Sequence, residues 1–126
     1  MLLTEYLSNL VKVIEEYSKT ELIIDSELTT DFRTEKIGII KGSITFTDNS
    51  RLFFTEYLDL RYKVEKLNYS FHYQKQDGTL IFRYDNARHK PPIDAFGHKH
   101  SSNGKIIVAE LPPLNSIFAE IMDFLL

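Results

Sequence analysis

The segment that decides the fold is residues 69–85, YSFHYQKQDGTLIFRYD, in which apolar and polar residues alternate on both sides of an Asp-Gly pair. Asp-Gly is one of the strongest signals for a two-residue hairpin turn. If Asp77 and Gly78 form the turn, residues whose numbers sum to 155 lie opposite each other. Aromatic residues then meet on one face, in the pairs Tyr73 with Phe82 and Phe71 with Tyr84.

The other face of this hairpin is polar. His72 lies opposite Arg83, and Ser70 lies opposite Asp85. Groups that carry charge near neutral pH are rarely gathered by the needs of a core, because they stay solvated unless they are paired. We therefore expect a candidate site on the polar face of the hairpin.

A second hairpin is predicted over residues 37–59, where hydrophobicity again has a period of two. A three-residue loop at positions 48–50 brings apolar residues together on one face, with Phe46 opposite Leu52 and Ile44 opposite Phe54. Further strands are expected near residues 21–27 and 105–111.

Helices are predicted at both ends of the chain, because apolar residues recur there every three or four positions. The first stripe, over residues 3–18, consists of Leu3, Tyr6, Leu7, Leu10, Val13, Ile14 and Tyr17. The second follows Pro113 and consists of Leu114, Ile117, Phe118, Ile121, Met122 and Leu125. The sequence thus predicts one α+β domain over residues 1–126: an antiparallel meander sheet of about 5–6 strands with the N-terminal and C-terminal helices packed on one face.

Composition narrows the class of protein. No apolar run approaches the length of a membrane span, and the N-terminus mixes polar with apolar residues, so we expect a cytoplasmic protein without membrane attachment. The absence of cysteine excludes disulfides and thiol nucleophiles. A net charge of −3 argues against nucleic-acid binding by the whole surface, although basic residues outnumber acidic ones between Arg83 and Lys105.

Residues 82–100, FRYDNARHKPPIDAFGHKH, contain three of the four histidines. Pro91-Pro92 and Gly97 favour a loop over residues 87–97 that leaves the sheet. His98 and His100 point to one side if their segment is extended. We therefore expect the loop to bring His89, His98 and His100 toward the polar face of the hairpin.

Three interpretations of these residues compete. In the first, Arg83, His98 and His100 cleave an RNA phosphodiester without a cofactor, with His89 or His72 as alternates and Asp85 orienting a histidine. In the second, His89, His98 and His100 hold a divalent metal for hydrolysis. In the third, Arg83 and Asp85 form a structural ion pair beside ordinary surface histidines. A binding module without enzymatic activity, whose open sheet face holds a protein partner, is a further alternative.

Several of these residues form a pattern that resembles the TumE family of prokaryotic toxin proteins. The matching stretches are Gly42 to Glu56, Tyr69 and Phe71 to Tyr73, Asp77-Gly78, Phe82 to Ala87 with His89, and His98-Lys99-His100. Arg88 stands where the family has proline, and Lys90 stands where it has a second histidine, so the role of that histidine is not carried over. The resemblance implies a toxin that acts on RNA or translation and is neutralised by a helix-turn-helix antitoxin; homo-oligomerisation is left open. We assign substrate binding to His72, Tyr84, Asn86, Arg88 and Lys99.

Overall fold

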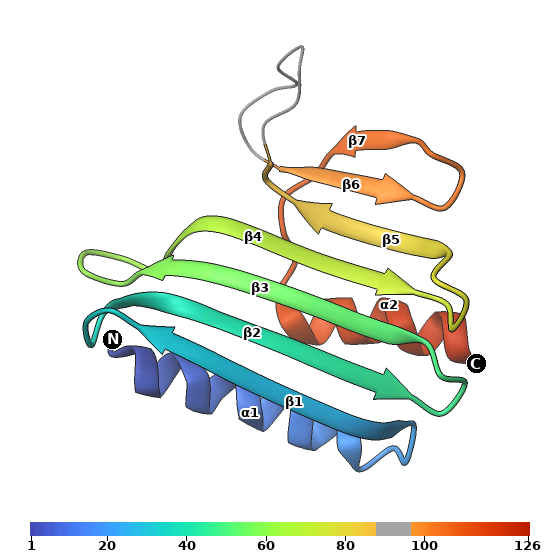
Figure 1. The fold of residues 1–126 in the computed structure, drawn as a ribbon, viewed down its shortest axis with the longest axis horizontal. Helices are drawn as coiled ribbons and strands as arrows, with labels where there is room; N and C mark the ends of the chain where they lie inside the picture. Colours follow the sequence, from blue (N-terminus) through green and yellow to red (C-terminus); the bar gives the residue numbers. More distant parts are fainter. Residues whose placement is uncertain (88–96) are drawn as a thin grey trace.

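The computed structural model describes residues 1–87 and 97–126. Two helices flank a sheet in the chain order predicted (Figure 1). The elements are α1 (Leu3–Ser18), β1 (Ile23–Phe32), β2 (Ile37–Phe46), β3 (Arg51–Asp59), β4 (Glu65–Gln74), β5 (Leu80–Asp85), β6 (His98–Ser101), β7 (Ile106–Val108) and α2 (Leu114–Leu125). The class is α+β, as the sequence predicts.

The sheet is an antiparallel meander, because its strands lie side by side in sequence order from β1 to β7. It has seven strands rather than the predicted five or six. The short segment around His98 and His100 accounts for the difference, since it pairs with β5 on one side and with β7 on the other. The expected strand over residues 105–111 is reduced to Ile106–Val108.

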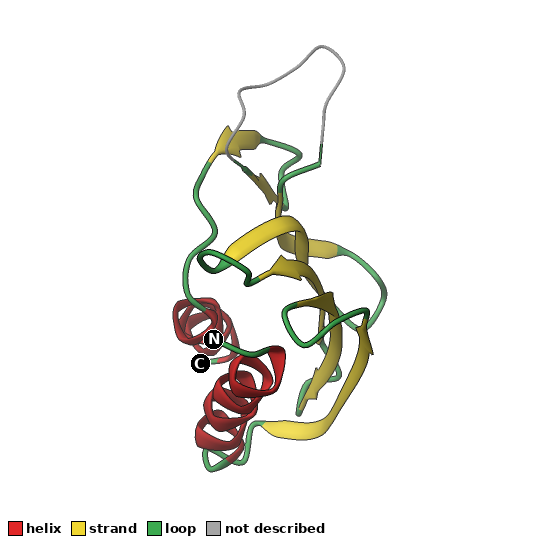
Figure 2. Cartoon of the chain, turned by 90° about the vertical axis from the view of Figure 1, so that its left-hand side faces the viewer, coloured by secondary structure: helices red, strands yellow, loops and turns green. Residues whose placement is uncertain are grey.

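Both helices cover the same face of the sheet (Figure 2). They also contact each other, because the ring of Tyr17 on α1 stacks on that of Phe118 on α2 with the centroids 4.7 Å apart. The core between helices and sheet is made of the alternate strand residues that point toward the helices, including Phe46, Phe54 and Tyr73, each at most 2% exposed. The opposite face of the sheet carries mostly polar residues, with a few aromatic and aliphatic ones such as Phe53, Tyr57 and Ile39.

The Asp77-Gly78 hairpin has the predicted register. Tyr73 pairs with Phe82, His72 with Arg83, and Ser70 with Asp85. The turn is wider than two residues, because Lys75 and Thr79 close it through a backbone hydrogen bond, and a bulge at Gln74 takes up the difference. The aromatic and polar faces of this hairpin are therefore those expected from the sequence.

The register predicted for the other hairpin is wrong by two residues. Ile44 pairs with Leu52, and Gly42 rather than Ile44 pairs with Phe54. The loop is longer than three residues because Asn49 adopts φ 64° and the backbone N–H of Ser50 donates to Asp48 Oδ1. Since two residues are a whole period of a strand, the apolar side chains still face the helices.

Candidate functional site

Five of the predicted site residues come together on three neighbouring strands of the open sheet face. His72 lies on β4, Arg83 and Asp85 on β5, and His98 and His100 on β6. The strand register aligns them in two rows, since Arg83 pairs with both His72 and His100, and Asp85 pairs with His98. We refer to these five residues as the His/Arg/Asp cluster.

Arg83 is the centre of the cluster. Its Nε donates to Asp85 Oδ2 at 2.8 Å, and its Nη1 lies 3.3 Å from His72 Nδ1. A guanidinium only donates hydrogen bonds, so the geometry requires His72 Nδ1 to accept and the proton of the neutral ring to sit on Nε2. That second nitrogen is 3.0 Å from Gln74 Oε1, which accepts the proton's hydrogen bond. Arg83 and Gln74 thus define one neutral tautomer of His72.

Gln74 was not among the predicted site residues. The signal for its role is its spacing of two from His72, because residues two apart on a strand share a face.

Asp85 is the only carboxylate in the His/Arg/Asp cluster, and it is only 4% exposed. Oδ1 accepts the backbone N–H of Ala87 at 3.2 Å, and Oδ2 accepts Nε of Arg83. The carboxylate is also near both histidines of β6, with Oδ2 3.3 Å from His100 Nε2 and Oδ1 3.9 Å from His98 Nδ1. One carboxylate therefore positions a guanidinium and two imidazoles.

Burial divides the cluster into two layers. Asp85 and His98 are buried, with His98 at 3% exposure, whereas Arg83, His100 and His72 are partly exposed. Contact with a ligand on this face therefore falls to the guanidinium and to the imidazoles of His72 and His100. In the buried layer, Asp85 contacts Arg83 and His100, and His98 lies near Asp85.

Tyr84 and Lys99, which we assigned to substrate binding, point to the helix side of the sheet and do not join the cluster. The Tyr84 hydroxyl donates to Glu120 Oε1 on α2 at 2.7 Å, and Lys99 Nζ lies 3.0 Å from Glu120 Oε2. Lys99 Nζ also lies 5.0 Å from the centre of the Tyr84 ring. Burial lowers the pKa of Lys99, but hydrogen bonds and charges of Tyr84 and Glu120 outweigh it and raise the pKa overall.

Asn86, also assigned to substrate binding, joins the end of β5 to β4. Its Oδ1 accepts the backbone N–H of Tyr69 at 2.9 Å, and its Nδ2 donates to the Leu67 carbonyl at 3.3 Å. The amide thus extends the hydrogen bonding of the sheet beyond the last paired residue of β5.

Arg88 and His89 lie outside the described residues, and so does the loop that was expected to fold over the cluster. Within residues 1–87 and 97–126, no three His, Asp or Glu side chains are arranged to hold a metal ion. The predicted metal site includes His89, so it stays a prediction.

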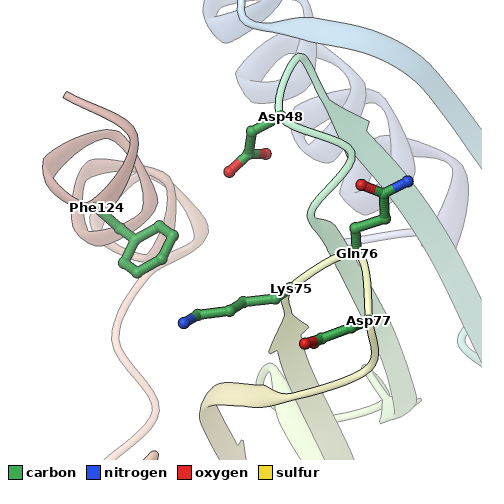
Figure 3. A pocket seen from close by; sticks show the side chains of 5 residues that line it. All are labelled: Asp48, Lys75, Gln76, Asp77 and Phe124. Atoms are coloured by element: carbon green, nitrogen blue, oxygen red, sulfur yellow. The ribbon is translucent and has the colours of Figure 1, made fainter.

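A separate pocket lies on the helix side of the sheet, where α2 ends (Figure 3). It has a volume of about 370 Å³ and lies between the end of α2 and the turns that follow β2 and β4. Its lining residues are Asp48, Lys75, Gln76, Asp77 and Phe124. None of them belongs to the His/Arg/Asp cluster.

Neither helix of the described chain is long and apolar enough to cross a membrane.

A meander sheet with two helices on one face and a buried carboxylate beneath an arginine and imidazoles on the other defines a small α+β protein with a candidate acid–base site. The chain belongs to the TumE toxin family, because the family model, Toxin TumE, matches residues 10–125. Membership of this family suggests that the chain is the toxin component of a toxin–antitoxin system, with an antitoxin as its partner. No curated protein and no solved structure matches the chain.

Proposed function

We propose that the protein is a toxin that cleaves RNA at the His/Arg/Asp cluster without a metal ion. The observation that carries the proposal is the position of Arg83, which is held by the Asp85 carboxylate 2.8 Å away and has an imidazole on each neighbouring strand. Cleavage of RNA by its own 2′-hydroxyl requires a base, an acid and a cation for the charged phosphorane. The cluster contains groups of all three kinds.

The burial of each residue supports a division of roles. Asp85 is 3.3 Å from His100 Nε2, where a carboxylate fixes the proton on that nitrogen and leaves Nδ1 to act as a base. His100 Nδ1 removes the proton of the 2′-hydroxyl as the 2′-oxygen attacks phosphorus. Arg83 neutralises the phosphorane, and the imidazolium formed at His100 gives the proton it has taken to the departing 5′-oxygen, which returns His100 to its neutral form. The products are a 2′,3′-cyclic phosphate and a 5′-hydroxyl, and no water is consumed.

The proposed role of Asp85 is that of a carboxylate that orients an imidazole. Because Asp85 is buried beneath the guanidinium, it acts on the substrate only through Arg83 and His100. The buried His98 lies next to the same carboxylate. His89 remains the alternative acid, and a divalent metal held with His98 and His100 remains the alternative chemistry.

Incubation of the purified protein with total cellular RNA, with and without chelator, tests the proposal. We expect cleavage in both conditions, with cyclic phosphate ends, and loss of at least a hundredfold in rate in Arg83→Ala and His100→Ala, because each removes a group used in the transition state. Arg33→Ala is the matched control, since its arginine is exposed at the far end of β1. Cleavage that stops with chelator would favour the metal alternative, and intact RNA in every sample would sink the catalytic proposal.

The partner is proposed to be a helix-turn-helix antitoxin encoded next to the toxin. Co-expression of both proteins with a tag on one of them tests this point, and we expect the two to purify together. If the toxin binds its partner and arrests growth but leaves RNA intact, the chain acts as a binding module. Homo-oligomerisation is tested on the same sample by light scattering.

A further inference from the structure

Two aromatic rings lie on the open face of β3, the face away from the helices. Phe53 and Tyr57 are four residues apart on one strand and therefore point to the same side. Their exposed fractions are 37% and 36%. The buried side of the same strand carries Leu52, Phe54 and Leu58, so the core does not need these two rings.

The register connects Phe53 to the His/Arg/Asp cluster. Phe53 pairs with His72, which pairs with Arg83, so the three side chains form one row across the sheet. The rings of Phe53 and His72 are in contact, with centroids 6.5 Å apart. Two strand spacings, about 10 Å, separate Phe53 from Arg83. A ring and a guanidinium thus lie side by side on the same surface.

Cations flank the two rings. Arg51 precedes Phe53 by two residues on β3 and shares its face, and Lys41 on β2 pairs with Thr55 between the two rings. Both basic residues are exposed. Of the acidic residues of this face, Asp25, Glu27 and Asp31 lie on β1 at the sheet edge. Asp59 at the end of β3 and Asp85 on β5 are each paired with an arginine. The cations next to the rings, Lys41 and Arg51, are unpaired within the described residues and therefore favour an anion on this part of the face.

We propose that Phe53 and Tyr57 are the stacking platform for bases of single-stranded RNA, with the scissile phosphate at Arg83. This inference rests on the proposed function and names the binding residues for its substrate. An open sheet face with aromatic rings and nearby cations is a recurring surface for single-stranded RNA, because unpaired bases lie flat on the rings while the backbone follows the cations. Every base has a π face, so this platform binds with little sequence preference.

The platform also selects single strands over duplexes. Bases in a duplex are stacked on each other and their faces are not available to protein rings. A nucleotide stacked on Phe53 is held beside His72, which is one strand away from Arg83, where the scissile phosphate is placed. The platform therefore acts on substrate position, and its loss should raise KM more than it lowers kcat.

Binding is measured separately from cleavage with a fluorescein-labelled oligouridylate that carries 2′-O-methyl groups, which removes the attacking hydroxyl. We expect Phe53→Ala and Tyr57→Ala each to weaken binding about tenfold in fluorescence anisotropy. Phe53→Tyr and Tyr57→Phe keep a ring and should bind as the wild type does. Tyr62→Ala is the control, because Tyr62 is 92% exposed outside the strand, between β3 and β4.

The outcomes separate this inference from the proposed function. If the wild type cleaves RNA and both alanine variants bind the oligonucleotide as tightly as it does, the platform is wrong and the ribonuclease stands. If the wild type neither binds nor cleaves RNA, both fail. If the alanine variants lose the antitoxin but keep the oligonucleotide, the rings belong to a protein interface, and the platform is again wrong. Near-UV circular dichroism confirms that each variant is folded.

Discussion

Arg83 and Asp85 form an ion pair between alternate residues of one strand, with Arg83 Nε 2.8 Å from Asp85 Oδ2. The spacing of two puts both side chains on the open face of β5, and the carboxylate is buried while the guanidinium remains partly exposed. A charged hydrogen bond whose acceptor is shielded from water is stronger than one on the surface.

A double-mutant cycle with Arg83→Ala and Asp85→Ala should therefore give a coupling free energy of about 1–2 kcal/mol, measured by urea unfolding. Asp31 and Arg33 provide a matched control, because they are the same residue types at the same spacing, 3.4 Å apart but well exposed. Their coupling should be below about 0.5 kcal/mol, as for surface pairs. Equal coupling in the two pairs would show that burial of Asp85 contributes nothing.

Gly42 is required by the ring of Phe54, its partner across β2 and β3. A Cβ at Gly42 would overlap the edge of that ring. The ring cannot turn aside easily, since it is buried and stacks on Phe71 with the centroids 5.2 Å apart. Gly42→Ala should lower the free energy of unfolding by about 1–3 kcal/mol, the usual cost of overpacking.

The double variant Gly42→Ala, Phe54→Leu is the informative measurement, because the smaller side chain removes the overlap. It should be less destabilised than the sum of the two single variants. Ser43→Ala, on the other face of β2, is the control and should change stability little. Additive effects would mean that the ring does not set the requirement for glycine.

The contact between Gly42 and Phe54 is an example of a structural feature that the sequence alone does not predict. Alternation fixes which face a strand residue takes, so the polar row of His72 and Arg83 was predictable from the Asp77-Gly78 turn. The register of the preceding hairpin was not, because it depends on the left-handed conformation of Asn49 and on a ring that packs over a glycine. The periodicity of the sequence predicts neither the conformation of Asn49 nor the packing of the ring over the glycine.

In the candidate site, too, some features could be predicted from the sequence and others could not. The neighbours of Arg83 follow from strand pairing, whereas burial of Asp85 and the bond from His72 to Gln74 depend on side-chain packing in three dimensions. Lys99 lies between two histidines in the sequence, and alternation turns it to the opposite face. Its assignment to substrate binding came from sequence proximity, which does not distinguish the faces of a strand.

Lys99 and Tyr84 should support stability rather than RNA cleavage, because both contact Glu120 on α2. Lys99→Met and Tyr84→Phe should each lower the free energy of unfolding by about 1 kcal/mol, the usual net value of a hydrogen bond. Cleavage at a temperature where both variants are folded should equal that of the wild type. A variant that loses cleavage without losing stability would instead support the assignment of its residue to substrate binding.

Alkaline pH should destabilise the protein through its buried tyrosines, of which Tyr73 gives the sharpest test. Burial raises the pKa of Tyr73 to about 12, although its hydrogen bond with Ser50 acts in the opposite direction. The pKa of tyrosine in an unfolded chain is about 10. Between these two values the folded protein keeps a proton that the unfolded chain has lost. The contribution of Tyr73 to stability is therefore complete below about pH 10 and is lost as the pH rises toward 12.

Urea unfolding at a series of alkaline pH values measures this loss as a slope. One retained proton contributes up to about 1.4 kcal/mol per pH unit, so Tyr73→Phe should make the slope shallower by up to that amount. The variant should also start from a lower stability, because Ser50 loses its hydroxyl partner.

Tyr62→Phe, at an exposed position, should leave the slope unchanged. The pKa values of Tyr6, Tyr69 and Tyr84 are also raised, chiefly by burial, so part of the slope should persist in Tyr73→Phe. An identical slope in Tyr73→Phe and the wild type would contradict the assignment of a retained proton to Tyr73.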